Sequence, residues 1–313
     1  MQTKLSVIIP VLNDTQELNA TLASLIATGG DPNRYEAIVV DDGSVTPAKI
    51  FEANKRPNIH LYRNNQRRGG GAARHQAAEL ATGDYLLLMD AHSRFAAYWL
   101  DRALERIVGN PTTIYNGMCL GLDFGERNTL EKAAGRYCGA YLVLHNPKTN
   151  EIFEGKWLTF TPEDDEEIPC LMGACYFVPR PWFFKLGGLK GLKLWGSEEP
   201  YLALKCWLAG GNIRFLKTVE IGHKFRTAAP YHTDYSDVLY NKMRPIYELM
   251  DEETRSFLYE KLKPHEGFET AFKNINRDMN EILQDRDYYQ KLLVKDLHWF
   301  CERFNIKHPL DKG

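Results

Sequence analysis

The sequence predicts an α/β fold, with a mixed, mostly parallel sheet flanked by helices and followed by a C-terminal helical appendage. Over about the first hundred residues, short apolar runs alternate with helical patterns, which is typical of βαβ units around a parallel sheet. The run Tyr-Leu-Leu-Leu-Met at 85–89 is apolar on both faces, as a central parallel strand should be. Beyond residue 236, apolar residues recur at helical spacing, for example at Phe268, Phe272 and Ile275.

Length, charge and cysteine usage limit the class of protein. The 313 residues can bury a large core, and 39 basic residues nearly balance 41 acidic ones, unlike a dedicated nucleic-acid binder. The N-terminal apolar run is too short for a signal sequence, and no run of 18 apolar residues follows, so we expect a cytoplasmic protein without a membrane span. Six cysteines without CxxC spacing are expected to be reduced, buried apolar residues rather than zinc ligands.

The elements of the first half follow one another at short intervals. An apolar strand is expected at 5–11, and Asp14 with Glu17 three residues later has the pattern of a capping box for the next helix. Further strands are expected at 36–40, 59–62 and 85–89, and a helix that Gly69, Gly70 and Gly71 open and Gly83 ends. These three glycines do not match a phosphate-binding loop and favour close packing of the helix.

The second half is expected to continue the sheet and then to become helical. The expected strands cover 115–122, 137–144, 173–178 and 212–216, and the expected helices cover 182–186, 199–209 and most of the chain beyond 236.

Two strands are expected to end in polar side chains at the same edge of the sheet. The strand at 36–40 is followed by Asp41 and Asp42, and the strand at 85–89 by Asp90 and His92. Ligands of open α/β sheets bind at this edge. Asp41 and Asp42 could accept hydrogen bonds from a ribose or a base, or serve only the turn that follows them.

Asp90 and His92 are candidate metal ligands. Because side chains alternate across a strand, both leave its end on one face, while Ala91 points to the other. A carboxylate beside an imidazole suits Mn²⁺ better than an all-oxygen Mg²⁺ or Ca²⁺ site. His223 is the candidate third ligand, and Arg226 three residues later could grip phosphate oxygens. The alternatives are a turn cap for Asp90 and ordinary surface histidines.

The segment Trp195-Gly-Ser-Glu198-Glu199 opens a helix. Its carboxylates could simply stabilise the helix N-terminus, or one of them could face a sugar or an acceptor hydroxyl.

Taken together, these segments resemble the GT-A glycosyltransferases, which have a Rossmann-like fold for nucleotide-diphosphate sugars. They are most similar to the catalytic domain of the polypeptide N-acetylgalactosaminyltransferases, collinearly from about Lys4 to Glu253. The motifs that carry the resemblance are Ser-Val-Ile-Ile-Pro10 with Asn13, Gly-Ala-Ala-Arg74, Leu-Leu-Leu-Met-Asp90-Ala-His92, Leu-Trp195-Gly-Ser-Glu-Glu199, and Ile-Gly-His223-Lys-Phe-Arg226 followed by Pro-Tyr231.

The resemblance implies a site for a UDP-sugar and a cation. Asp90, His92 and His223 would bind Mn²⁺, with Mg²⁺ as the alternative. The residues implied near the donor are Pro10, Asn13, Asp41, Asp42, Arg74, Asp90, Ala91, Arg226 and Tyr231, the last in a lid. The residues implied near the sugar and the chemistry are Trp195, Glu198 and Glu199. Residues 1–255 would form the catalytic domain, with a nucleotide-binding half at 1–110 and an acceptor half at 111–255, and residues 256–313 the helical extension.

The leading hypothesis is a metal-dependent glycosyltransferase that moves a hexose or N-acetylhexosamine from a UDP-sugar to a hydroxyl of a protein, a glycan or a modified nucleobase. The alternatives are a glycosyltransferase for hydroxymethylated bases of phage DNA and a non-catalytic nucleotide-sugar-binding scaffold. The family's membrane anchor and lectin domain are not seen, which favours a bacterial or phage-infected host cytosol. Glu199 stands where the family has asparagine and where inverting family 2 enzymes carry an aspartate base, so the stereochemistry stays open. A homodimer through the C-terminal helices is a further expectation.

Overall fold

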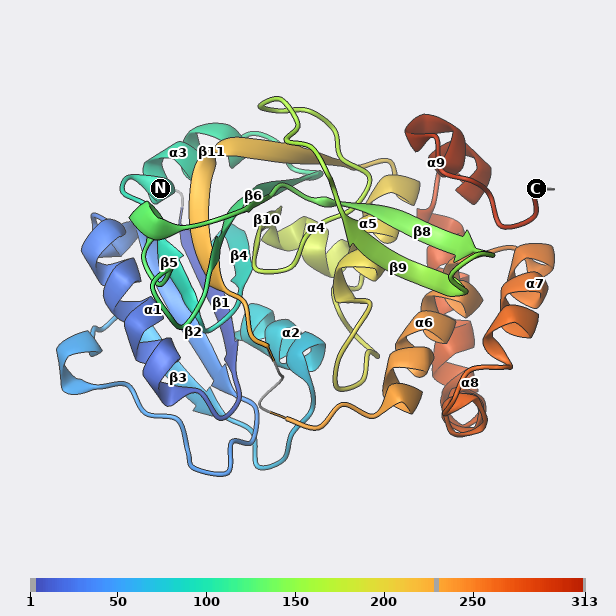
Figure 1. Cartoon of the computed structure of the whole chain (residues 1–313), viewed down its shortest axis with the longest axis horizontal. Helices are drawn as coiled ribbons and strands as arrows, with labels where there is room; N and C mark the ends of the chain where they lie inside the picture. The colour runs from blue at the N-terminus through green and yellow to red at the C-terminus, as the bar shows by residue number, and fades with distance from the viewer. Residues whose placement is uncertain (1–3, 228–230, 312–313) are drawn as a thin grey trace.

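The main sheet contains the predicted strands except the one at 137–144, together with two short additional ones. A computed structural model describes residues 4–227 and 231–311. The strands of this sheet are β1 (Leu5–Val11), β2 (Tyr35–Asp41), β3 (Ile59–Arg63), β4 (Tyr85–Met89), β5 (Ser93–Phe95), β6 (Thr113–Leu122), β7 (Arg136–Tyr137), β10 (Cys175–Pro179) and β11 (Asn212–Lys224). Within the described residues they form one nine-stranded sheet in the order β3-β2-β1-β4-β10-β6-β11-β5, with β7 paired to β6 (Figure 1).

The sheet is mixed and mostly parallel, as predicted. β1 pairs in parallel with both β2 and β4, and β2 pairs in parallel with β3. β10 runs antiparallel between β4 and β6, while β11 is parallel to β6. The carboxyl ends of β1, β2, β4, β6 and β11 therefore point the same way, and the polar residues that follow them share one edge.

Helices cover both faces of the sheet because the strands alternate their apolar side chains between two cores. Val7 and Ile9 of β1 pack with α1 (Thr15–Thr28) and α3 (Trp99–Ile107). Ile8, on the opposite face, belongs to the core of α2 (Gly70–Leu80), α4 (Arg180–Lys185) and α5 (Glu198–Leu208). Short 3₁₀ turns lie at Pro32–Arg34, Glu52–Asn54 and Leu130–Lys132.

The C-terminal helices pack onto the second of these cores. They are α6 (Tyr235–Leu249), α7 (Glu252–Leu262), α8 (Phe268–Leu292) and α9 (Leu297–Phe304). Leu239, Leu258, Ile282 and Phe300 are buried in the same apolar cluster as Leu204 of α5. Figure 1 shows these helices together at the end of the molecule away from α1 and β3. The C-terminal helices thus share their core with one face of the main sheet.

A separate hairpin lies between the sheet and the C-terminal helices. β8 (Ala140–Asn146) and β9 (Glu151–Trp157) pair antiparallel, with Ala140 opposite Trp157 (Figure 1). The sequence predicts β8 but not β9, because Glu-Ile-Phe-Glu-Gly-Lys-Trp lacks strict alternation of apolar and polar residues.

Two local predictions at helix ends are wrong. The Asp14 side chain makes no capping hydrogen bond to α1, and Glu17 accepts hydrogen bonds from Arg94 (2.8 Å) and Lys224 (2.9 Å), so there is no capping box. The cationic groups of β5 and β11 compete for these carboxylates more strongly than backbone N–H groups do. The second error concerns α2, which ends at Leu80 rather than at Gly83.

All six cysteines are buried, as predicted, and none of them forms a disulfide. Among the described residues, no helix is both long enough and apolar enough to cross a membrane.

Candidate functional site

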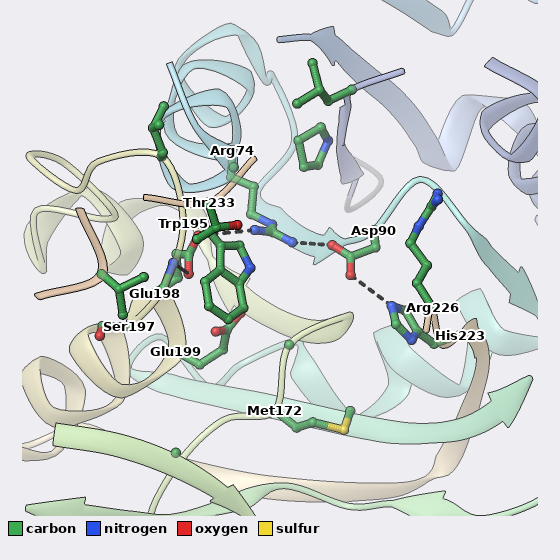
Figure 2. Close-up of a pocket in the computed structure, with 18 of the residues that line it drawn as sticks. Arg74, Asp90, Met172, Trp195, Ser197, Glu198, Glu199, His223, Arg226 and Thr233 are labelled. Atoms are coloured by element: carbon green, nitrogen blue, oxygen red, sulfur yellow. Dashed lines mark hydrogen bonds and ion pairs between the residues drawn. The ribbon is translucent and has the colours of Figure 1, made fainter. Parts of the chain in front are cut away.

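A cavity of about 680 Å³ opens at the carboxyl edge of the sheet. Its walls come from the ends of β1, β4 and β11, from the start of α5, and from the hairpin strand β9. Figure 2 shows the side chains that face one another across it.

Asp90, His92 and His223 meet in this cavity although they are far apart in the chain. β11 continues to Lys224 and pairs with β5, which places His223 opposite Ser93, the residue after His92. One ligand atom from each of the three side chains lies within 4.8 Å of the others. His223 Nε2 is 3.0 Å from Asp90 Oδ2, and His92 Nε2 is 3.9 Å from the same oxygen.

The protonation states of Asp90 and His92 fit a divalent cation. Burial opposes ionisation of Asp90, but the Arg74 guanidinium and the His223 ring hold its pKa well below the usual range. Burial lowers the pKa of His92 to about 4, so its imidazole is neutral near pH 7. An ionised carboxylate beside a neutral imidazole is a donor set that Mn²⁺ accepts.

Arg74 fixes the orientation of Asp90. Its guanidinium forms an ion pair with one Asp90 oxygen, while the other oxygen faces His223, as Figure 2 shows. The same guanidinium lies 4.0 Å from Glu198. Arg74 therefore links the candidate metal ligands to the start of α5.

The other residues implied near the donor occupy two kinds of position. Pro10, Ala91, Arg226 and Tyr231 line the cavity. Arg226 forms an ion pair with Asp14, which also lines the cavity. A charged phosphate group entering the cavity would therefore compete with Asp14 for this guanidinium.

Asp41, Asp42 and Asn13 organise the turns beside the cavity. Asp41 is 1% exposed, and its carboxylate accepts hydrogen bonds from the backbone N–H groups of Ser44 and Ala48. Asp42 lines the cavity and holds the N-terminus of α2, accepting from the Gly69 N–H at 2.7 Å. The Asn13 side chain accepts from the Val45 N–H at 2.9 Å. For Asp41 and Asn13 the structure shows a turn role, one of the two alternatives that the sequence left open for Asp41.

Trp195, Glu198 and Glu199 line the opposite wall. Trp195 is 50% exposed, and Glu198 is buried and accepts a hydrogen bond from the Gly196 N–H at 3.0 Å. Burial raises the pKa of Glu198, and burial together with the Glu198 charge raises the pKa of Glu199 to about 7. Glu199 faces Gly173, where a Cβ would lie 3.0 Å from its Oε1. A carboxyl group with such a pKa can take up or release a proton near neutral pH.

Several wall residues were missed by the sequence analysis. Phe153, Glu154 and Trp157 come from β9, and Lys242 from α6. Trp157 is 50% exposed and stacks edge-on against Tyr137. A tryptophan in a segment that also carries Glu151, Glu154 and Lys156 is the signal that could have indicated this wall.

Comparisons with known proteins identify the family of this chain. The family model described as "Glycosyl transferase family 2" matches residues 6–170. The chain belongs to glycosyl transferase family 2. This family 2 chain is 24% identical over 310 residues to human polypeptide N-acetylgalactosaminyltransferase 10, covering 96% of the chain and 50% of the relative. It is 29% identical over 244 residues to the putative polypeptide N-acetylgalactosaminyltransferase 13 of Drosophila melanogaster, covering 72% of this chain and 42% of the relative. The chain thus spans about half the length of the curated relatives it matches.

Solved structures show the same fold. The crystal structure of GalNAc-T7 with UDP, GalNAc and Mn²⁺ matches with a TM-score of 0.71 at 22% identity, covering 97% of this family 2 chain and 57% of the other. The S. aureus TarS 1-349 structure in complex with UDP-GlcNAc matches with a TM-score of 0.54 at 16% identity, covering 83% of this chain and 72% of the TarS chain. The predicted GT-A fold and the predicted enzyme class, a glycosyltransferase, are confirmed.

Proposed function

We propose that this enzyme transfers a hexose or N-acetylhexosamine from a UDP-sugar to a hydroxyl acceptor, with a divalent cation in the cavity. The observation that carries the proposal is the meeting of Asp90, His92 and His223 at the carboxyl edge of the sheet, within 4.8 Å of one another. The sugars and nucleotides named with GalNAc-T7 and TarS support a UDP-sugar donor.

The three side chains would hold Mn²⁺, with Mg²⁺ as the alternative cation. When bound, the cation would neutralise the charge that builds on the departing diphosphate. Arg74 keeps Asp90 ionised and oriented, and Arg226 is free to exchange its carboxylate partner Asp14 for a phosphate oxygen. Tyr231, which stacks on the Arg67 guanidinium at 4.5 Å, would close over the donor and exclude water.

Glu199 is proposed as the proton acceptor. The acceptor oxygen forms a bond to the anomeric carbon, the bond from that carbon to UDP breaks with its electron pair passing to UDP, and the hydroxyl proton passes to Glu199. Its pKa of about 7 suits this task near neutral pH. Glu198 and Trp195 would position the sugar, since both line the same wall.

The acceptor is proposed to be a peptide or a glycan rather than DNA. Glu198 and Glu199 bring two carboxyl groups to the cavity wall, and Glu154 pairs there with Lys242 at 3.4 Å. Such a wall disfavours a polyanion, whose binding depends on cationic side chains. Trp157 and Trp195, each 50% exposed, offer apolar faces on which a sugar ring or an apolar side chain can stack.

The test substitutes His223 with alanine and measures UDP release from UDP-sugars with added Mn²⁺. Release should fall at least about a hundredfold, the range in which loss of a charge-stabilising group lies. His60→Ala, in edge strand β3, is the matched control and should release UDP at the wild-type rate. Undiminished release by His223→Ala would remove the metal assignment. Calorimetric binding of UDP-sugars without transfer to any acceptor and without slow hydrolysis would instead favour the scaffold alternative.

A further inference from the structure

The loop between α4 and α5, residues 186–197, carries Trp195 into the cavity and leads directly into Glu198. Its backbone is held by α6, through Asn241, which lies behind the cavity wall. The Asn241 side chain donates to the carbonyl oxygens of Lys193 (2.7 Å), Trp195 and Gly196 (both 3.0 Å), and accepts from the Lys193 N–H at 2.7 Å. Asn241 is fully buried, and its hydrogen bonds hold the loop at Trp195 and at the residues beside it.

Arg244, one turn further along α6, holds the same loop at Gly191. Its guanidinium donates to the Gly191 carbonyl at 3.2 Å and is 1% exposed. Gly191 has φ +80°, and a Cβ there would overlap the guanidinium. The loop can pass this close to Arg244 because residue 191 is glycine.

Helix α8 adds two carboxylates to that of Glu248 of α6, which accepts from the Arg244 Nε at 2.6 Å. Asp278, Glu281 and Asp285 stand three and four residues apart, which puts their carboxylates on one face of the helix. Glu281 accepts from Arg244 at 3.0 Å and Asp285 at 2.6 Å. Asp278 lies 3.4 Å from the ammonium group of Lys193, which also stands 3.8 Å from the Tyr240 ring. This acidic face of α8, formed by Asp278, Glu281 and Asp285, therefore contacts the loop directly through Lys193 and indirectly through Arg244.

We propose that α8 is a positioning element of the catalytic site, whose acidic face fixes the loop that presents Trp195 and Glu198 to the cavity. The role of these residues in transfer rests on the proposed function, but the structural part of the claim does not. A long helix packed behind the site would otherwise serve only to bury apolar surface.

The experiment measures backbone amide hydrogen exchange in the whole protein carrying Asp285→Ala. Amides of residues 190–197 should exchange about tenfold faster or more, while β1 and β4 keep their wild-type rates, because a buried cation loses one of its partners locally. Asp287→Ala, on the exposed face of α8 two residues away, is the matched control and should leave amide exchange unchanged both in residues 190–197 and in β1 and β4. Unchanged exchange in the loop, or an equal increase in every element, would overturn the proposal.

Two further readouts complete the test. Lys193→Met removes the contact with Asp278 from the loop side, and it replaces Asp285→Ala if that variant does not fold. It should give the same increase in amide exchange at residues 190–197. Unchanged exchange in the loop of Lys193→Met would refute the proposal. With a UDP-sugar, Asp285→Ala should lower kcat about tenfold while the Kd for UDP with Mn²⁺ stays unchanged. A wild-type protein that transfers no sugar would refute the proposed function alone, because the exchange result still decides whether α8 holds the loop. A faster-exchanging loop with undiminished kcat would refute the positioning role alone.

Discussion

Glu199→Gln should become more stable relative to the wild-type protein as the pH rises. Burial and the neighbouring Glu198 raise the pKa of Glu199 from its ordinary 4.5 to about 7. Below pH 4.5 the carboxyl is protonated in both the folded and the unfolded protein. Above that pH the unfolded chain ionises first, so the stability contributed by the bound proton is lost as pH rises through about 7.

The magnitude follows from the pKa difference. A tenfold change in proton affinity is about 1.4 kcal/mol, so ionising Glu199 in the folded protein costs about 3 kcal/mol at most. Glutamine carries no charge at any pH, and Glu199→Gln should therefore gain about 2 to 3 kcal/mol of unfolding free energy relative to wild type between pH 4.5 and 8.

Urea unfolding of both proteins at several pH values, without donor or cation, measures this difference. Glu105→Gln, at an exposed position of α3, is the control and should show no such trend. Glu198→Gln should move the midpoint of the Glu199 effect to lower pH, since it removes the neighbouring negative charge. A difference between Glu199→Gln and wild type that stays constant across this range would refute the reasoning.

Three other substitutions test particular contacts. Arg244→Leu should lower the unfolding free energy by on the order of 3 to 5 kcal/mol, because it leaves Glu248 buried without its partner, whereas Arg277→Leu at the surface should have little effect in the same urea titration. Gly191→Ala should destabilise the protein more than Gly109→Ala, because both glycines have a positive φ but only a Cβ at residue 191 would overlap the Arg244 guanidinium. The backbone strain that both variants share is on the order of 1 to 3 kcal/mol. Equal melting temperatures of the two variants would contradict the role of Arg244. Arg226→Ala should raise the KM for the UDP-sugar about tenfold with little change in melting temperature, as expected for a forked contact with phosphate oxygens, and an unaltered KM would remove that contact.

Those parts of the fold that depend on strong local patterns could be predicted from the sequence. The apolar runs of β1, β2 and β4 specify buried parallel strands, and the polar residues after them specify the edge at which a ligand binds. The helical spacing at Phe268, Ile275 and Ile282 likewise specified α8, although not the surface against which it packs.

The remaining parts depend on contacts between distant segments. β11 was expected to stop at Leu216, where polar residues interrupt its apolar run, yet after an irregularity in its pairing with β6 it continues to Lys224. This continuation brings His223 beside Asp90. The capping pattern at Asp14 and Glu17 failed for a related reason, since Lys224 and Arg226 from the same strand end take both carboxylates. Local propensity predicts neither result, because the deciding charges arrive from more than two hundred residues away.

The central claim is that Asp90, His92 and His223 bind one cation together. Electron spin-echo spectroscopy of Mn²⁺ bound with UDP tests it most directly, because it detects the nitrogen nuclei that coordinate the ion. We predict couplings from two imidazole nitrogens in the wild-type protein, of which His92→Ala and His223→Ala each remove one. A spectrum without imidazole nitrogen, or one that neither substitution alters, would contradict the account.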